Sequence, residues 1–315
     1  LGRRSLDLVV GELPLKECVQ FWGPQAGRIA TKEIVDILSV TGGVPRYLEE
    51  VDPGLSADEN LKRMCYSPNS ILRVDFDEMF NDVITNQPRL TADVLRTLVD
   101  GPLSATEIAA ALQMEKGGRV SAALLQLAEA GFVSADAARN PETGAAIRER
   151  RYRLCDNYSR YYLKFVERVT KAIDSGSYAF TSLSRLNDWN TVMGLQFENL
   201  VVNHFTELMP YLHLGGTVIT SAAPYRKIGR RDRNKGCQVD LLLQAENMLY
   251  FVEAKRQQKI AASVVRAVDE KIRRISRPDG VSARAALVYD GELAPSIEAD
   301  GYFDAVVPFG KLLGF

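Results

Sequence analysis

Apolar residues in the first half of the chain recur mainly at helical spacing. The segment TKEIVDILSVTGGVPRYLEEV, residues 31–51, has a helical apolar face that Gly42 and Gly43 interrupt before Pro45 opens another turn. The preceding segment SLDLVVGELP, residues 5–14, predicts a short strand. A strand with nothing before it would be an unpaired edge, so we expect the chain to be the C-terminal part of a longer protein.

The pattern between residues 88 and 155 predicts three short helices followed by a β-hairpin. Ser104 and Glu107 form a capping box at the start of the second helix, and Gly131 closes the third. This order predicts a winged helix-turn-helix. Its third helix offers few polar groups for DNA, whereas the hairpin offers more arginines. Nucleic-acid binding and a packing or protein-contact role therefore both stay open for this segment.

The next segment, DNYSRYYLKFVERVTKAI, is an aromatic-rich helix at residues 156–173. Its tyrosines and Phe165 share one face, which favours packing between domains. Periodicity is lost at about residues 180–190, where we expect a domain boundary.

The last part of the chain predicts a small mixed sheet covered by helices on both faces. A helix with Phe197, Leu200, Val201 and Phe205 on one face comes first. Two apolar strands, an amphipathic helix and two more apolar strands follow in the sequences GCQVDLLLQAENMLYFVEAK, IAASVVRAVDEKIRRIS, ARAALVYD and FDAVVPF. The fold class is therefore a multi-domain α/β protein.

Three charged residues interrupt the first two of these strands. Alternation puts Asp240 on one face of its strand, and Glu253 and Lys255 on one face of the next. If the strands pair through the short connection AEN, the two carboxylates converge beside the ammonium. Oxygen ligands suit Mg²⁺ or Mn²⁺, and the ammonium could orient or activate water or stabilise charge on a phosphate.

The residues VD at 239–240 and EAK at 253–255 resemble the PD-(D/E)xK nuclease superfamily, which has the restriction-endonuclease-like fold. The resemblance implies that Asp240 and Glu253 are metal ligands and that Lys255 is the catalytic lysine. It also implies that Glu198, on the opening helix, is an auxiliary catalytic and metal ligand. Val239 departs from the proline common at that position. The alternatives are a surface salt bridge and a degenerate nuclease fold kept for binding.

Basic residues gather around this predicted site although the whole chain, with 39 basic and 40 acidic residues, is nearly neutral. A local positive rim is what a phosphate backbone requires, although a solvated flexible loop is the alternative. The residues predicted to contact DNA are Arg226, Lys227, Arg230, Arg231, Arg233, Lys235, Arg273 and Arg274, together with Arg148 and Arg151 in the hairpin.

A longer resemblance covers nearly the whole chain. The segments TGGVPRYLEEV, YRLCDNYSRYYLKFV, GLQFENLV and QVDLLLQ…FVEAK are similar to the C-terminal part of a prokaryotic AAA/STAND-type ATPase family with a winged helix and a nuclease-like domain. The resemblance implies a helical lid-like segment in which Arg46 senses nucleotide; an ordinary helix-start residue is the alternative. No G-x-x-x-x-G-K-[ST] occurs, so we expect no ATPase activity from this chain, with ATP bound only by a longer parent.

Composition narrows the remaining possibilities. The four cysteines are scattered and the only two histidines are His204 and His213, which argues against a structural zinc site or a disulfide framework. The apolar runs are shorter than the ~18 residues of a membrane span, and no signal peptide is evident. We therefore expect a cytoplasmic protein without membrane contact, and oligomerisation stays open.

These patterns predict a DNA-processing protein with a Mg²⁺-dependent endonuclease domain, fused to an upstream ATPase domain in its parent. A non-catalytic nucleic-acid- or protein-binding module of an ATPase is the alternative, and a pure protein-interaction scaffold is a second one. The expected parts are a lid-like segment, a winged helix, a connecting helix with linker and the nuclease-like domain, at residues 1–85, 86–156, 157–189 and 190–315.

Overall fold

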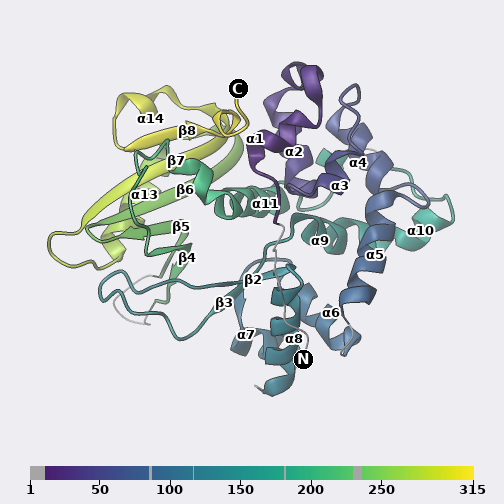
Figure 1. The fold of residues 1–315 in the computed structure, drawn as a ribbon, viewed down its shortest axis with the longest axis horizontal. Coiled ribbons are helices and arrows are strands. Elements are labelled where there is room, and N and C mark those ends of the chain that lie inside the picture. Colours follow the sequence, from purple (N-terminus) through teal and green to yellow (C-terminus); the bar gives the residue numbers. More distant parts are fainter. Residues whose placement is uncertain (1–10, 85–86, 116, 181, 230–235) are drawn as a thin grey trace, which may run out of the picture.

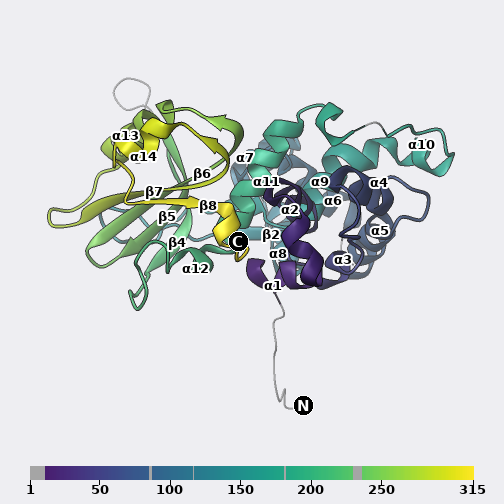
Figure 2. The same ribbon diagram turned by 90° about the horizontal axis from the view of Figure 1, so that it is seen from above.

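The computed structural model describes residues 11–84, 87–115, 117–180, 182–229 and 236–315. The chain is an α/β protein in which a mixed five-stranded sheet lies on one side and a group of helices on the other (Figure 1). Helix α11 (Trp189–Asn203) lies between these two parts, and the view from above shows the same arrangement (Figure 2).

Short helices form the N-terminal part. Helix α2 ends where Gly42 adopts a φ of +59°, as its two glycines predicted. Residues 11–14 are not a strand; the rest of the predicted strand at 5–14 lies outside the described residues. The helices are α1 (Leu15–Gln20), α2 (Thr31–Thr41), α3 (Pro45–Leu48), α4 (Ala57–Cys65) and α5 (Ile71–Val83), with a 3₁₀ segment at Gly23–Arg28.

The next segment has the predicted order of three helices and a hairpin. Ser104 and Glu107 cap each other's backbone groups, as the sequence predicted. The three strands pair antiparallel in the order β1-β3-β2. The elements are α6 (Pro88–Thr97), β1 (Leu103–Ser104), α7 (Ala105–Ala111), α8 (Gly118–Glu129), β2 (Val133–Asp136) and β3 (Arg151–Leu154).

The aromatic-rich segment is buried, in agreement with the packing role predicted for it. It begins as α9 (Asn157–Tyr161) and continues through a π-helical turn (Tyr162–Val166) and a 3₁₀ turn (Glu167–Val169) into α10 (Thr170–Asp174). Tyr162 stacks on Phe76 of α5 with ring centroids 4.1 Å apart. This segment therefore packs against α5 and contributes to the core of the helical part.

The C-terminal sheet has the order β4-β5-β6-β7-β8, antiparallel from β4 to β6 and parallel from β6 to β8. The predicted mixed sheet is thus present. Its opening helix is shorter than predicted, because the chain leaves α11 at His204 and Phe205 begins a separate turn. The elements are α12 (Phe205–Leu208), β4 (Ser221–Lys227), β5 (Cys237–Ala245), β6 (Met248–Ile260), α13 (Ser263–Arg274), β7 (Ser282–Leu293), α14 (Pro295–Ala299) and β8 (Ala305–Pro308).

Alternation along β5 and β6 divides the core into two layers. Leu241 and Val252 face the large core that includes α11, whereas Leu242 and Phe251 pack with Ile275 directly after α13. Burying each such side chain contributes roughly 1.5–3 kcal/mol, so the hydrophobic pattern fixes which face each strand residue occupies.

The loop between β2 and β3, residues 137–150, reaches the edge of the C-terminal sheet. The Gln244 side chain on β5 donates a hydrogen bond to the Arg139 carbonyl at 2.8 Å, and the Ser221 hydroxyl on β4 donates to the Ala137 carbonyl at 3.5 Å. This hairpin loop therefore lies against β4.

Candidate active site

The hairpin of β5 and β6 brings Asp240 and Glu253 together. A two-residue turn separates the paired residues Ala245 and Met248, and the ladder runs back to Leu241 opposite Val252. Asp240 and Glu253 are the next two residues in this register. The ladder ends here, and the Asp240 carboxylate instead accepts the Ala254 backbone N–H at 2.9 Å. The predicted convergence is therefore present where the two strands separate.

Two lysines hold the buried Glu253 carboxylate. Lys255 Nζ lies 2.9 Å from Glu253 Oε1, and Lys271 Nζ of α13 lies 2.5 Å from Oε2. Lys271 also lies 4.0 Å from Asp240 Oδ1. Lys271 was not among the site residues predicted from the sequence. Its position three residues after the inward-facing Val268 was the signal that it faces the sheet.

Glu198 approaches the same site from α11. It lines a small cavity together with Asp240, Arg153 and Arg160. Burial, then the charge of Asp240, raises the pKa of Glu198 to about 8. Burial, then the charge of Glu253, raises the pKa of Asp240 to about 6. The site thus concentrates acidic groups in a place that water solvates poorly, which disfavours their charged forms.

Lys255 stays a cation in this environment. Burial disfavours its charged form, but the carboxylates of Glu253, Asp240 and Glu198 outweigh that effect and raise the pKa of Lys255. Its side chain remains about one-third exposed, so the ammonium can reach a bound anion.

The residues that could hold a divalent metal are Asp240, Glu253 and Glu198. Across the described ranges, no group of three or more His, Cys, Asp and Glu side chains is arranged as a ready metal site. The donor chemistry nevertheless fits Mg²⁺ or Mn²⁺, because all the donors are carboxylate oxygens. The position beside Glu253 and Asp240 also accommodates a positive charge, since the Lys271 ammonium already lies there.

Most of the predicted DNA contacts around the sheet are engaged within the protein or lie outside the described residues. The Lys227 ammonium donates to the Arg274 carbonyl. Arg273 pairs with Asp269 and Arg274 with Glu270, each at 2.8 Å. Arg226 is exposed on β4. The remaining predicted residues of this loop, Arg230, Arg231, Arg233 and Lys235, are outside the described residues.

The arginines of the hairpin differ in their accessibility. Arg148 is exposed, whereas Arg151 is partly buried, pairs with Glu107 at 3.0 Å and donates to the Pro102 carbonyl at 2.5 Å. Arg153 is almost fully buried and bonds Asn199 of α11 at 2.6 Å. Helix α8 presents the exposed Leu125 on its outer face. The accessible positive charge of this segment therefore lies both in the hairpin loop, at Arg148, and at the start of α8, at the exposed Arg119.

Arg46 is exposed on α3 and lies 3.4 Å from Glu50, one turn along the chain. This is the arrangement of an ordinary helix-surface ion pair, and the nucleotide-sensing role stays a prediction.

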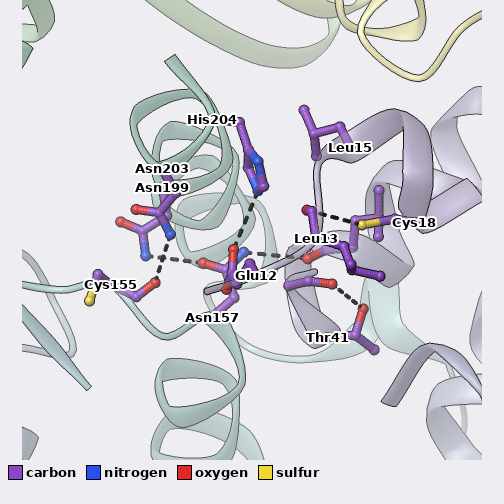
Figure 3. Close-up of polar contacts among 12 residues, drawn as sticks. Glu12, Leu13, Leu15, Cys18, Thr41, Cys155, Asn157, Asn199, Asn203 and His204 are labelled. Carbon is purple, nitrogen blue, oxygen red and sulfur yellow. Dashed lines mark hydrogen bonds and ion pairs between the residues drawn. The ribbon is translucent and has the colours of Figure 1, made fainter. Parts of the chain in front are cut away.

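A buried polar cluster that sequence reasoning missed lies between the helical part and α11. The side chain of His204 points toward Glu12 (Figure 3). Its Nε2 lies 3.3 Å from Glu12, close enough for an ion pair without a well-aligned hydrogen bond, and its Nδ1 lies 2.9 Å from Glu207. Burial lowers the pKa of His204, but the two carboxylates outweigh it and raise the pKa to about 9.

Comparison with known proteins adds little to this geometry. No family model matches the chain, and no curated protein matches it. Among solved structures, protein VC1899 from Vibrio cholerae is similar at 14% sequence identity and a TM-score of 0.31. That match covers 79% of this chain and 55% of the other, so this chain spans about half of VC1899. A similarity this distant carries no functional argument.

In the part of the chain that the structure describes, no helix combines the length and apolar character needed to cross a bilayer.

Proposed function

We propose that this chain is a DNA-processing protein whose C-terminal part, residues 190–315, hydrolyses phosphodiester bonds with Mg²⁺ or Mn²⁺. The observation that carries the proposal is the register of β5 and β6. It sets Asp240 beside Glu253, with Lys255 two residues further along, at the point where the strands separate. Burying two carboxylates and an ammonium in a sheet is costly. Binding of a metal ion and a phosphate at this place would explain why these charged groups are there.

The side chains divide the chemistry between them. Asp240, Glu253 and Glu198 would hold the cation, which when bound polarises the phosphate and supplies the nucleophilic water. The raised pKa of Lys255 keeps its ammonium protonated. This favours charge stabilisation on the phosphate over a role as a general base.

In this proposal residues 86–156 act as a winged helix that positions the duplex. The exposed Arg148 in the loop and Arg226 on β4 support it, because the loop lies against β4 and both side chains are open to solvent. Phosphate contacts of this kind position DNA without reading its sequence.

The longer resemblance extends the proposal to a parent protein. Residues 1–85 would form the lid-like end of an upstream ATPase domain, and residues 157–189 would connect the winged helix to the nuclease-like domain. ATP would bind only to that parent, in the cytoplasm, with Arg46 near the nucleotide.

A second candidate function is a non-catalytic DNA- or protein-binding module. The observation that favours it is the pairing of both Glu253 oxygens with lysines, which neutralises the carboxylate without a metal. Such a module would bind DNA in a salt-sensitive way and cleave nothing.

One experiment separates these functions. Supercoiled plasmid and single-stranded DNA are incubated with the chain, with and without Mn²⁺. We expect cleavage only with Mn²⁺, and none by a folded Asp240→Ala/Lys255→Ala variant. The matched control Glu246→Ala/Lys259→Ala changes exposed residues of the same hairpin and should retain activity.

The other outcomes are equally decisive. Equal cleavage by the Asp240→Ala/Lys255→Ala variant would refute the catalytic assignment. Salt-sensitive binding without cleavage would favour the non-catalytic module, and no DNA affinity at all would indicate a protein-interaction scaffold.

A further inference from the structure

The Lys271 ammonium lies beside Glu253 and Asp240, the two carboxylates that would also bind a metal cation. Its ammonium lies 2.5 Å from Glu253 Oε2 and 4.0 Å from Asp240 Oδ1, and its side chain is only 19% exposed. Lys255 occupies the other Glu253 oxygen at 2.9 Å. Both oxygens of this carboxylate are therefore engaged by ammonium groups.

This pairing has an electrostatic reason. Asp240 and Glu253 are both buried and adjacent, and two carboxylates in such a place repel each other unless a cation lies beside them. Lys271 provides that cation from α13, across the face of the sheet. Its flexible four-carbon stem allows the ammonium to swing away without moving the helix.

We propose that Lys271 is an internal counter-ion that competes with the divalent metal for Asp240 and Glu253. In the free protein its ammonium stabilises the carboxylate pair. A metal that takes the Glu253 Oε2 lone pair must first displace it, so the displaced contact weakens metal affinity. This inference rests on the proposed function, since it concerns the metal ligands of that site.

Calorimetric titration of the full chain with Mn²⁺ alone tests the competition. We expect Lys271→Met to lower the Kd for Mn²⁺ about tenfold relative to the unchanged chain, equivalent to about 1.4 kcal/mol. Lys259→Met is the matched control, because Lys259 is exposed on β6 and contacts neither carboxylate; its Kd should not change. Lys271→Gln repeats the measurement with a polar side chain.

Thermal unfolding gives a readout independent of catalysis. Without the Lys271 ammonium, Lys255 is the one cation left against the two carboxylates among the described contacts, so Mn²⁺ should raise the Tm of Lys271→Met more than that of the unchanged chain. If Lys271→Met does not fold, the Lys271→Gln variant decides the outcome by the same two measurements.

The failures of the inference and of the proposed function can be told apart. Mn²⁺ binding of equal affinity to the unchanged chain, Lys271→Met and Lys271→Gln would overturn the counter-ion role and leave the metal site standing. Absence of Mn²⁺ binding from all of them would overturn both. Binding that survives Asp240→Asn/Glu253→Gln would place the metal elsewhere and overturn both as well.

Discussion

At the scale of the residue, Asp240 combines a charge with a hydrogen bond. Its carboxylate accepts the Ala254 N–H just beyond the end of the β5–β6 ladder, and so replaces a backbone partner that the separating strand no longer supplies. A buried backbone N–H without an acceptor is costly, so Asp240 has a structural role besides the metal-binding role that we propose for it.

Two substitutions separate these roles. Asp240→Asn can still accept the Ala254 N–H, whereas Asp240→Ala cannot. We expect Asp240→Ala to be less stable than Asp240→Asn by about 1–3 kcal/mol in urea unfolding, because it leaves the N–H unsatisfied. Equal stability of the two variants would show that the hydrogen bond contributes nothing. Both variants should lose Mn²⁺-dependent cleavage.

At the scale of the element, Arg256 joins helix α2 to the sheet. It follows Lys255 on β6 but points to the opposite face, where it pairs with Asp36 of α2 and lies 3.6 Å from Asp290 of β7. All three side chains are nearly buried. The strand that carries Glu253 and Lys255 is thereby tied to the helical part.

Removing this arginine should be strongly destabilising. Arg256→Met leaves the nearly buried Asp290 carboxylate without its cation and leaves Asp36 with only Lys32, 2.7 Å away, and we expect a loss of about 3–5 kcal/mol in urea unfolding. Adding Asp36→Asn and Asp290→Asn should recover part of that loss, since the uncompensated charges are gone. A triple variant no more stable than Arg256→Met would show that packing, not charge, sets the cost.

At the scale of the whole molecule, His204 joins parts that are distant in sequence. It lies at the end of α11 and pairs with Glu12 near the start of the described chain (Figure 3). The Glu207 carboxylate on α12 accepts the Leu15 N–H at 3.1 Å. This cluster holds the N-terminal segment onto the C-terminal part.

The raised pKa of His204 predicts a pH dependence of stability. The folded pKa of about 9 exceeds the unfolded value of 6.5. The stabilisation is therefore complete below pH 6.5 and is lost as the pH rises through 9, with a total of roughly 3 kcal/mol. Urea unfolding between pH 6 and 10 should show this loss in the unchanged chain and a smaller loss in His204→Asn, in which Glu198, with its pKa raised to about 8, still titrates. The control His213→Asn changes an exposed histidine and should show the same loss of stability as the unchanged chain.

The hairpin register was predictable because it depends on local rules. Alternation along β5 and β6 and a short polar connection fix which residues face each other, so Asp240 and Glu253 meet as expected. The pairing of Arg273 with Asp269 could also have been predicted, since the two lie four residues apart on one helix.

Contacts between distant elements were not predictable in the same way. Lys271 reaches Glu253 only because α13 packs across the sheet, and Arg153 is buried only because β3 abuts α11. No sequence spacing connects His204 with Glu12, because the two residues are almost two hundred positions apart. Such contacts depend on how elements pack, and a single sequence does not encode that as a period or a spacing.

The loop at 137–150 has one more consequence, because β4 is an outermost strand. Outermost strands present open backbone groups that can pair with other chains and start aggregation. The contacts of Ala137 and Arg139 with Ser221 and Gln244 set this loop over that border of the sheet. The loop that we propose to contact DNA would therefore also limit pairing of this edge with another copy of the chain.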